Sequence, residues 1–99
     1  MKPLPRTLTI SVTQRDIDKG VRSDCAFCPI ALAMRRELRR QGFVNNRVHV
    51  GGTLHVTTRR AGKVVGGYHL PQQAANFMGS FDNAIVVNPI TFTTGLRPR

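Results

Sequence analysis

The chain has 99 residues, of which 15 are lysine or arginine and 5 are aspartate or glutamate, so its formal net charge is +10. This length suits one domain with a single modest core, and we expect residues 1–99 to form it. No apolar run approaches the roughly 20 residues of a membrane helix, and no apolar signal segment follows the basic N-terminus. We therefore expect a soluble, cytoplasmic protein, in a cell or in a virus-infected cell, without a membrane partner.

The excess of positive charge favours polyanionic partners, either nucleic acid or an acidic protein surface. Twelve of the fifteen basic residues are arginines, whose planar guanidinium groups fit phosphate and carboxylate oxygens better than ammonium groups do. The plainer interpretation is a solubilising coat of charge, or a base composition that favours arginine codons.

The first elements are a strand and a short helical turn. After an extended lead-in over residues 1–6, apolar and hydroxyl-bearing residues alternate over residues 7–13, which predicts a half-buried strand. Thr13 and Asp16 have the spacing of a capping box, and Gly20 would end the turn that this box begins.

The best-specified element is a helix within residues 23–41. Ser23 or Asp24 can cap an initial turn, and Pro29 suits the first position of the regular helix, which makes Cys28 its N-cap. Gly42 is suited to end it. The predicted buried stripe consists of Phe27, Ile30, Ala31, Met34 and Leu38. The opposite face carries Arg35, Arg36, Arg39 and Arg40.

Alternating residues predict strands over residues 47–50 and 53–59, on either side of Gly51-Gly52. We interpret these glycines as a hairpin turn, the alternative being a kink or bulge within one long strand. A second turn at residues 60–62 leads to a strand over residues 63–70.

Pro71 is predicted to open a second helix that ends at Asp82-Asn83. A last strand is predicted over residues 85–93, where Pro89 indicates an edge or a bulge. Residues 95–99 form a basic tail. The buried stripe of the second helix is Ala74, Phe77, Met78 and Phe81.

The predicted order is therefore strand, helix, two or three strands, helix, strand. Each helix has one apolar stripe, so both should cover the same face of a mostly antiparallel sheet, in a two-layer α+β sandwich. If residues 47–59 count as one strand, the order is that of a ferredoxin-like fold. The edge strand over residues 85–93 could pair with a second copy in a homodimer.

Cys25 and Cys28 form a Cys-x-x-Cys motif where the main helix begins, a position typical of thioredoxin-like redox sites. The order of elements argues against a thioredoxin core, because the chain finishes with a helix and then a strand. Together with two of His49, His55 and His69, with His49 and His55 as the preferred pair, the cysteines would give a zinc site, although the histidine spacing is not that of a zinc finger. The plainer interpretation is that both cysteines pack in the core and that the protein has no cofactor.

Two basic clusters, one on the helix and one at a hairpin tip, make the candidate nucleic-acid site. Phosphate contacts there would give salt-dependent, sequence-tolerant binding. Most phenylalanines are assigned to the core, which leaves Phe43 and Tyr68 for stacking and favours duplex or structured RNA over single strands. No phosphate-binding loop precedes a helix and no acidic pair is suited to acid-base chemistry, so we expect no enzyme activity. The candidate contact residues are Arg35, Arg36, Arg39, Arg40, Arg47, Arg59, Arg60 and Lys63.

Three stretches of the chain resemble a group of uncharacterised small proteins from bacteriophages and their hosts. They are Val-Thr-Gln-Arg-Asp-Ile-Asp-Lys-Gly (12–20), Cys-Pro-Ile-Ala-Leu-Ala (28–33), and Tyr-His-Leu-Pro (68–71) followed by residues 77–82. These motifs are structural in character, so the resemblance assigns no functional residue. It implies a protein of the cytoplasm of a bacterial host cell, encoded by the host or its virus, that binds a host or virion component. The alternative function is thus a protein interaction module, an anti-defence inhibitor or virion part whose arginines contact an acidic protein surface.

Overall fold

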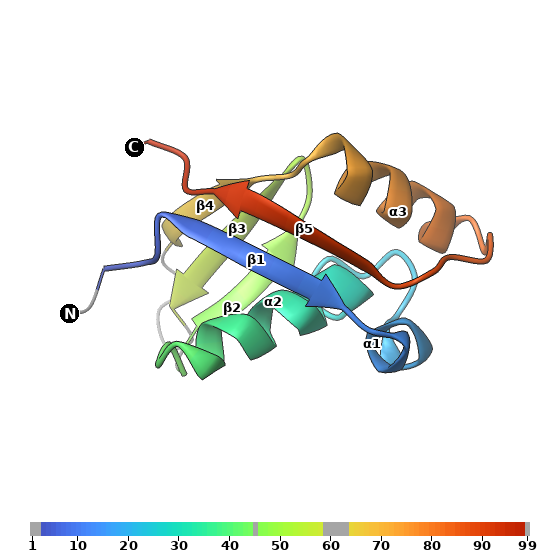
Figure 1. The fold of residues 1–99 in the computed structure, drawn as a ribbon, viewed down its shortest axis with the longest axis horizontal. Helices are drawn as coiled ribbons and strands as arrows, with labels where there is room; N and C mark the ends of the chain where they lie inside the picture. Colours follow the sequence, from blue (N-terminus) through green and yellow to red (C-terminus); the bar gives the residue numbers. More distant parts are fainter. Residues whose placement is uncertain (1–2, 45, 59–63, 99) are drawn as a thin grey trace.

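The computed structural model describes residues 3–44, 46–58 and 64–98, and its arrangement is drawn in Figure 1. Strands and helices alternate as an α+β fold, which confirms the predicted class. The elements are β1 (Thr7–Val12), α1 (Gln14–Lys19), α2 (Pro29–Arg40), β2 (Asn46–Val50), β3 (Thr53–Thr58), β4 (Val64–His69), α3 (Gln72–Asp82) and β5 (Ile90–Gly95). No helix in the described ranges is long and apolar enough to cross a membrane.

The strands pair antiparallel, as predicted, but in two sheets. β1 pairs with β5, with Thr7 opposite Gly95 and Val12 opposite Ile90. β2, β3 and β4 form a second sheet in that order. Val50 lies opposite Leu54, so the glycines between them form a hairpin and the two-strand interpretation is confirmed. The ferredoxin-like order, which required residues 47–59 to be one strand, does not occur.

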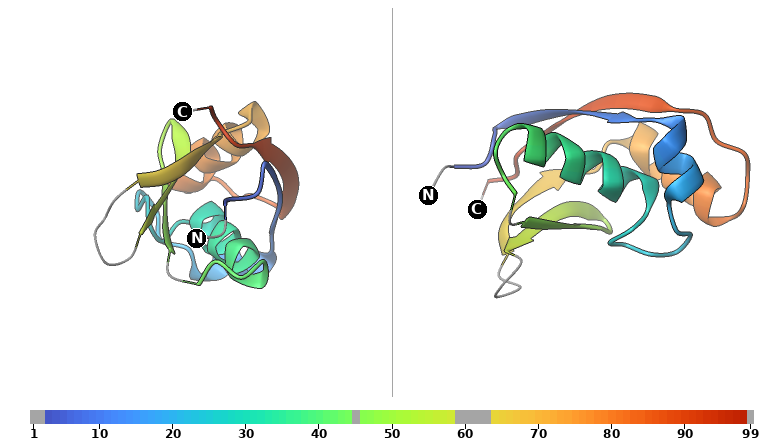
Figure 2. Two further views of the ribbon diagram at one scale, coloured as in Figure 1. Left: turned by 90° about the vertical axis from the view of Figure 1, so that its left-hand side faces the viewer. Right: turned by 90° about the horizontal axis from the view of Figure 1, so that it is seen from below.

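Helix α2 lies between the two sheets, with β1 and β5 on one side and β2 and β3 on the other (Figure 2). The expectation that both helices cover one face of a single sheet is corrected here, because α2 contacts both β1 and β2. Its buried surface is wider than the predicted stripe and includes Ala33, which lies beside Ile30. At the far side of α2, a bridge between Tyr68 and Leu96 brings the sheets together, so the strands curl around the helix.

One continuous core results, and every element of regular structure except α1 contributes fully buried or nearly buried apolar side chains to it. β1 alternates exposed and buried residues along its whole length, as predicted. The largest fully buried residues are Tyr68, Leu8, Ile10, Ile30, Met34, Leu38 and Leu54. Ala74, Phe77 and Phe81 of α3 are buried and Met78 is partly buried.

The predicted helix ends are confirmed. Thr13 and Asp16 form a complete capping box at α1. Cys28 is the N-cap of α2 and Pro29 its first residue, and Gly42 after the helix has φ 97°. The exception is α3, which begins at Gln72, one residue later than predicted, with Pro71 as its N-cap.

Other predictions were wrong. Phe27 precedes α2 and is 50% exposed, because the helix begins at Pro29 and the residue falls outside its periodicity. β5 begins at Ile90, five residues later than predicted, because β1 ends opposite that residue and offers no partner beyond it. The turn predicted at residues 60–62 lies outside the described residues.

The lead-in and the tail are anchored to the second sheet. Leu4 lies over Gly66, and a Cβ added at Gly66 would be 2.5 Å from Cδ1 of Leu4. The Tyr68 hydroxyl donates a hydrogen bond to the carbonyl oxygen of Pro5. Leu96 donates its backbone N–H to Arg6, and Arg97 donates to Gly67. Both ends of the described chain therefore lie beside β4.

We expect Gly20→Ala to lower the free energy of unfolding by about 1–3 kcal/mol, because an added methyl group overpacks this site. Its Cβ would lie 2.6 Å from the Pro29 ring and 2.9 Å from the Asp16 carbonyl oxygen. Gly79→Ala is the control. Nothing lies within 4 Å of the Cβ added there, and replacing a helical glycine stabilises by about 0.5–1 kcal/mol. Urea unfolding followed by circular dichroism measures both, and an unchanged Gly20→Ala variant would contradict the close packing of α1 on α2.

Candidate functional site

The arginines of α2 lie on the side of the helix that the sheets leave uncovered. Arg36, Arg39 and Arg40 are exposed and Arg35 is partly buried. This is the predicted placement, but the four side chains have different surroundings.

Arg36 is tied to the protein itself. Its guanidinium donates to the two carboxylate oxygens of Asp16 at 2.7 and 2.8 Å and to the carbonyl oxygen of Ser11 at 2.9 Å. The Asp16 side chain is 5% exposed and also accepts hydrogen bonds from the backbone N–H and hydroxyl of Thr13. Arg36 therefore joins α2 to α1 and to the end of β1, and its charge is offset within the molecule.

The Asp16 carboxylate is stabilised against its burial. Burial by itself raises the pKa of Asp16, but hydrogen bonds from Arg36 and Thr13 and the positive charge of Arg36 together hold that pKa below its usual value. The same contact raises the pKa of Arg36. Both groups are therefore ionised at neutral pH.

Arg40 is paired as well. Its guanidinium donates to both carboxylate oxygens of Glu37, at 2.9 and 2.6 Å, and the Gln41 amide donates to the same group at 2.7 Å. These hydrogen bonds, the one from Arg40 first, lower the pKa of Glu37. The pair is exposed on the Arg40 side, so solvent and salt weaken it and another anion can compete for this arginine.

Arg35 lies over the ring of Phe27, 4.9 Å from its centroid, a cation-π contact at the start of the helix. Arg39 and Arg47 are exposed, and their side chains have no hydrogen bond or ion pair with any other residue that the structure describes. The predicted contact residues Arg59, Arg60 and Lys63 lie outside the described residues.

Charge is distributed unevenly along the molecule, whose longest extent is 40 Å. The C-terminal turn of α2, the start of β2 and both chain termini lie at one end in Figures 1 and 2. We call this the basic end. Among the described residues it has a single acid, Glu37, against Arg6, Arg39, Arg40, Arg47 and Arg97.

The opposite end is formed by α1, residues 20–28 and the C-terminal end of α3 (Figures 1 and 2). We call it the α1 end, and its charges of both signs nearly balance. Its basic residues are Arg15, Lys19 and Arg22, and its acids are Asp16, Asp18, Asp24 and Asp82.

All three histidines lie on the outer face of the second sheet, away from α2. His49 is directly opposite His55, and His69 is opposite Thr53. Their neighbours along the strands, such as Val48 and Leu54, are buried on the inner face. Alternation of apolar residues with histidine along β2 and β3 is the period-2 pattern that puts successive side chains on opposite faces of a sheet.

The two cysteines differ. Cys28 is fully buried, and its sulfur accepts a hydrogen bond from the Ala31 N–H at 3.4 Å as the cap of α2. Burial raises the pKa of the Cys28 thiol, and the hydrogen bonds from Ala31 and Ile30 offset this only in part, so it is an unreactive thiol at neutral pH. The packing interpretation is confirmed for Cys28 and wrong for Cys25, which is exposed.

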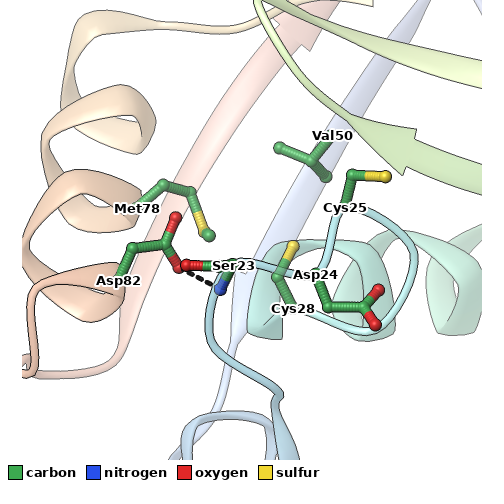
Figure 3. A pocket seen from close by; sticks show the side chains of 7 residues that line it. All are labelled: Ser23, Asp24, Cys25, Cys28, Val50, Met78 and Asp82. Atoms are coloured by element: carbon green, nitrogen blue, oxygen red, sulfur yellow. Dashed lines mark hydrogen bonds between the residues drawn. The ribbon is translucent and has the colours of Figure 1, made fainter.

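Cys25 instead contacts His49. Its sulfur lies 3.9 Å from Nδ1 of His49, and its carbonyl oxygen accepts the N–H of Val50. This contact between a loop and β2 had no signal in the sequence, because the two residues are 24 positions apart. A cavity of about 200 Å³ lies beside this loop (Figure 3). It is lined by Ser23, Asp24, Cys25, Cys28, Val50, Met78 and Asp82.

In Figure 3 the sulfurs of Cys25 and Cys28 point in different directions, and both thiols are free. Of the four residues predicted as alternative zinc ligands, Cys25 and His49 are in contact, His55 faces Thr53 through a 2.7 Å hydrogen bond, and Cys28 is in the core. No group of three or more histidine, cysteine or acidic residues in the described part of the chain is arranged to hold a metal ion.

Comparisons with family models, with curated proteins and with solved structures give no significant match to this chain.

We expect Asp16→Asn to lower the free energy of unfolding at pH 7 by about 1–3 kcal/mol, since it removes charge-assisted hydrogen bonds from a buried group. Because the pKa of Asp16 is lowered in the folded state, its contribution is present above the unfolded pKa of about 3.9 and disappears as the pH falls through the folded value. The difference from wild type should therefore shrink below about pH 4.

The matched control is Asp18→Asn, since Asp18 is exposed and only accepts a hydrogen bond from the Gln14 amide. Chemical denaturation at several pH values measures both variants. Equal effects of the two substitutions would contradict the assigned role of the Arg36 contact.

Proposed function

We propose that the protein is a non-catalytic binding protein for a polyanion, and that its ligand is the phosphate backbone of nucleic acid. The observation that carries the proposal is the basic end, where five described arginines have one acidic neighbour. A surface of this kind attracts polyanions over long range and orients them on approach.

The contact residues proposed from the structure differ in part from those expected from the sequence. Arg39 and Arg47 are exposed and unpaired among the described residues, so their guanidinium groups are available for phosphate. Arg40 can exchange its exposed pair with Glu37 for a phosphate oxygen. Arg36 is left out of the proposed contact residues, although it is exposed, because its guanidinium already donates hydrogen bonds to Asp16 and Ser11.

The aromatic residues favour backbone contacts over base stacking. Tyr68 is fully buried, and Phe43 is partly buried against the core. Neither is a fully exposed aromatic residue of the kind that a sequence-tolerant binder of single strands uses for stacking. We therefore propose duplex or structured nucleic acid as the ligand. An acidic protein surface is the alternative ligand for the same arginines, and a binding experiment distinguishes the two.

Replacing Arg39 and Arg47 together by glutamate should weaken binding to a short labelled duplex and flatten its salt dependence. Each lost phosphate contact reduces the slope of log K against log salt by about 0.9, so the expected change is about 2 for the two arginines. Fluorescence anisotropy over a series of salt concentrations, on both DNA and RNA duplexes, measures the slope.

The control is the double variant Arg15→Glu with Arg22→Glu. It changes the net charge by the same amount with exposed arginines at the α1 end, and it should keep the wild-type slope. If both double variants lose affinity equally, the net charge and not the basic end governs binding. If wild type binds no duplex at low salt but is retained by a polyglutamate column, the acidic protein partner is favoured.

A further inference from the structure

The segment between α3 and β5 is the most exposed apolar part of the described chain. Val86 is 93% exposed and Ile85 is 59% exposed, whereas Val87 is partly buried against the core. Val86 adds almost nothing to the stability of the folded monomer, because its side chain is nearly as accessible as in an unfolded chain. Its apolar character therefore needs another explanation, and exposed apolar patches commonly mark interaction sites.

The backbone of this segment is unpaired as well. Ile85 donates its N–H to the Ser80 carbonyl oxygen, but residues 86–88 have no hydrogen bond with any residue that the structure describes. β1 ends at Val12, opposite Ile90, so no strand runs alongside. The sequence Ile-Val-Val is strongly suited to strand pairing. If another strand paired with these residues, they would become part of β5 and extend it toward its N-terminus.

Charge limits which partner can pair with it. From Asn83 to Leu96 the chain has no charged residue, although its net charge is +10. The segment lies at the α1 end, as far from the basic end as the molecule extends (Figures 1 and 2). Around it the acids and bases of the α1 end nearly balance, so a second copy can approach here without the repulsion that the basic end would cause.

We propose that residues 85–88 pair antiparallel with the same residues of a second copy, about a two-fold axis close to Val86. The segment suits self-pairing because Val86 has a β-branched apolar neighbour on each side, Ile85 and Val87. The side chains that meet across a two-fold axis are therefore nearly the same in both chain directions. A two-fold contact requires such a self-complementary surface.

The dimer places its two basic ends at opposite extremes. This consequence, unlike the pairing itself, depends on the proposed function. Two basic ends on one particle would bind a long polyanion at two sites, and the second contact would raise the apparent affinity through its high effective concentration.

Sedimentation equilibrium over a range of protein concentrations tests the pairing. Wild type should approach twice the 11.0 kDa of one chain as its concentration rises, and Val86→Asp should stay at one chain mass. Val44→Asp is the matched control, since Val44 is 54% exposed and precedes β2 at the basic end; it should dimerise as wild type does. Val86→Ile should dimerise too.

A wild type that stays monomeric at every concentration overturns the proposal, and so does a Val86→Asp variant that dimerises normally. Equal loss of the dimer in Val44→Asp would show that charge alone, and not this segment, controls association. The Arg39→Glu, Arg47→Glu protein separates the two proposals, because it should remain dimeric while losing polyanion binding. Conversely, Val86→Asp should keep the wild-type affinity for a duplex too short to reach two basic ends.

Discussion

The burial of α2 between two sheets is the constraint on which the rest of the structure depends. A helix that packs on a single sheet needs one apolar stripe, but α2 contacts β1 on one side and β2 on the other. Ala31, Ala33 and Met34 are all buried, so the buried part of this helix is wider than one stripe. What remains of its circumference faces solvent, and polar and charged residues occupy nearly all of it.

All five acidic side chains accept hydrogen bonds within the folded chain. Asp16 completes a cap and holds Arg36, Asp24 accepts the N–H groups of Ala26 and Phe27, and Asp82 accepts the N–H of Ser23, whose φ is 57°. The remaining contacts are those of Asp18 with Gln14 and Glu37 with Arg40. Since four of the five acids make these contacts away from the basic end, the positive charge of that end is left largely uncompensated.

The features that the sequence predicted are those decided by neighbouring residues. The capping box at Thr13, the start of α2 at Pro29 and the hairpin at Gly51-Gly52 each depend on a few adjacent positions. The two-sheet arrangement depends instead on which strands meet, and alternation along a strand shows which side is buried but not which strand lies beside it. β5 shows the same limit, since Ile85, Val86 and Val87 have strand propensity but β1 ends before it could pair with them.

The candidate site shows this limit more sharply. Helical periodicity places Arg36 and Arg39 on the same exposed face, and nothing local distinguishes them. The difference arises because Asp16, 20 residues earlier, is brought under Arg36 by the packing of α1. Likewise the contact of Cys25 with His49 depends on the loop before α2 running beside β2.

The length of the molecule separates the charges of its two ends. Electrostatic interactions between exposed charges are screened over about 8–10 Å at physiological salt, whereas the structure extends over 40 Å. The field of the basic end is therefore weak at the α1 end, where charges of both signs are present. A molecule of +10 charge with uniform distribution would repel every copy of itself in all orientations, but this one repels strongly only when basic ends face each other. Under the proposed function, the polarity that attracts a polyanion to the basic end also leaves the α1 end without a strong field of one sign.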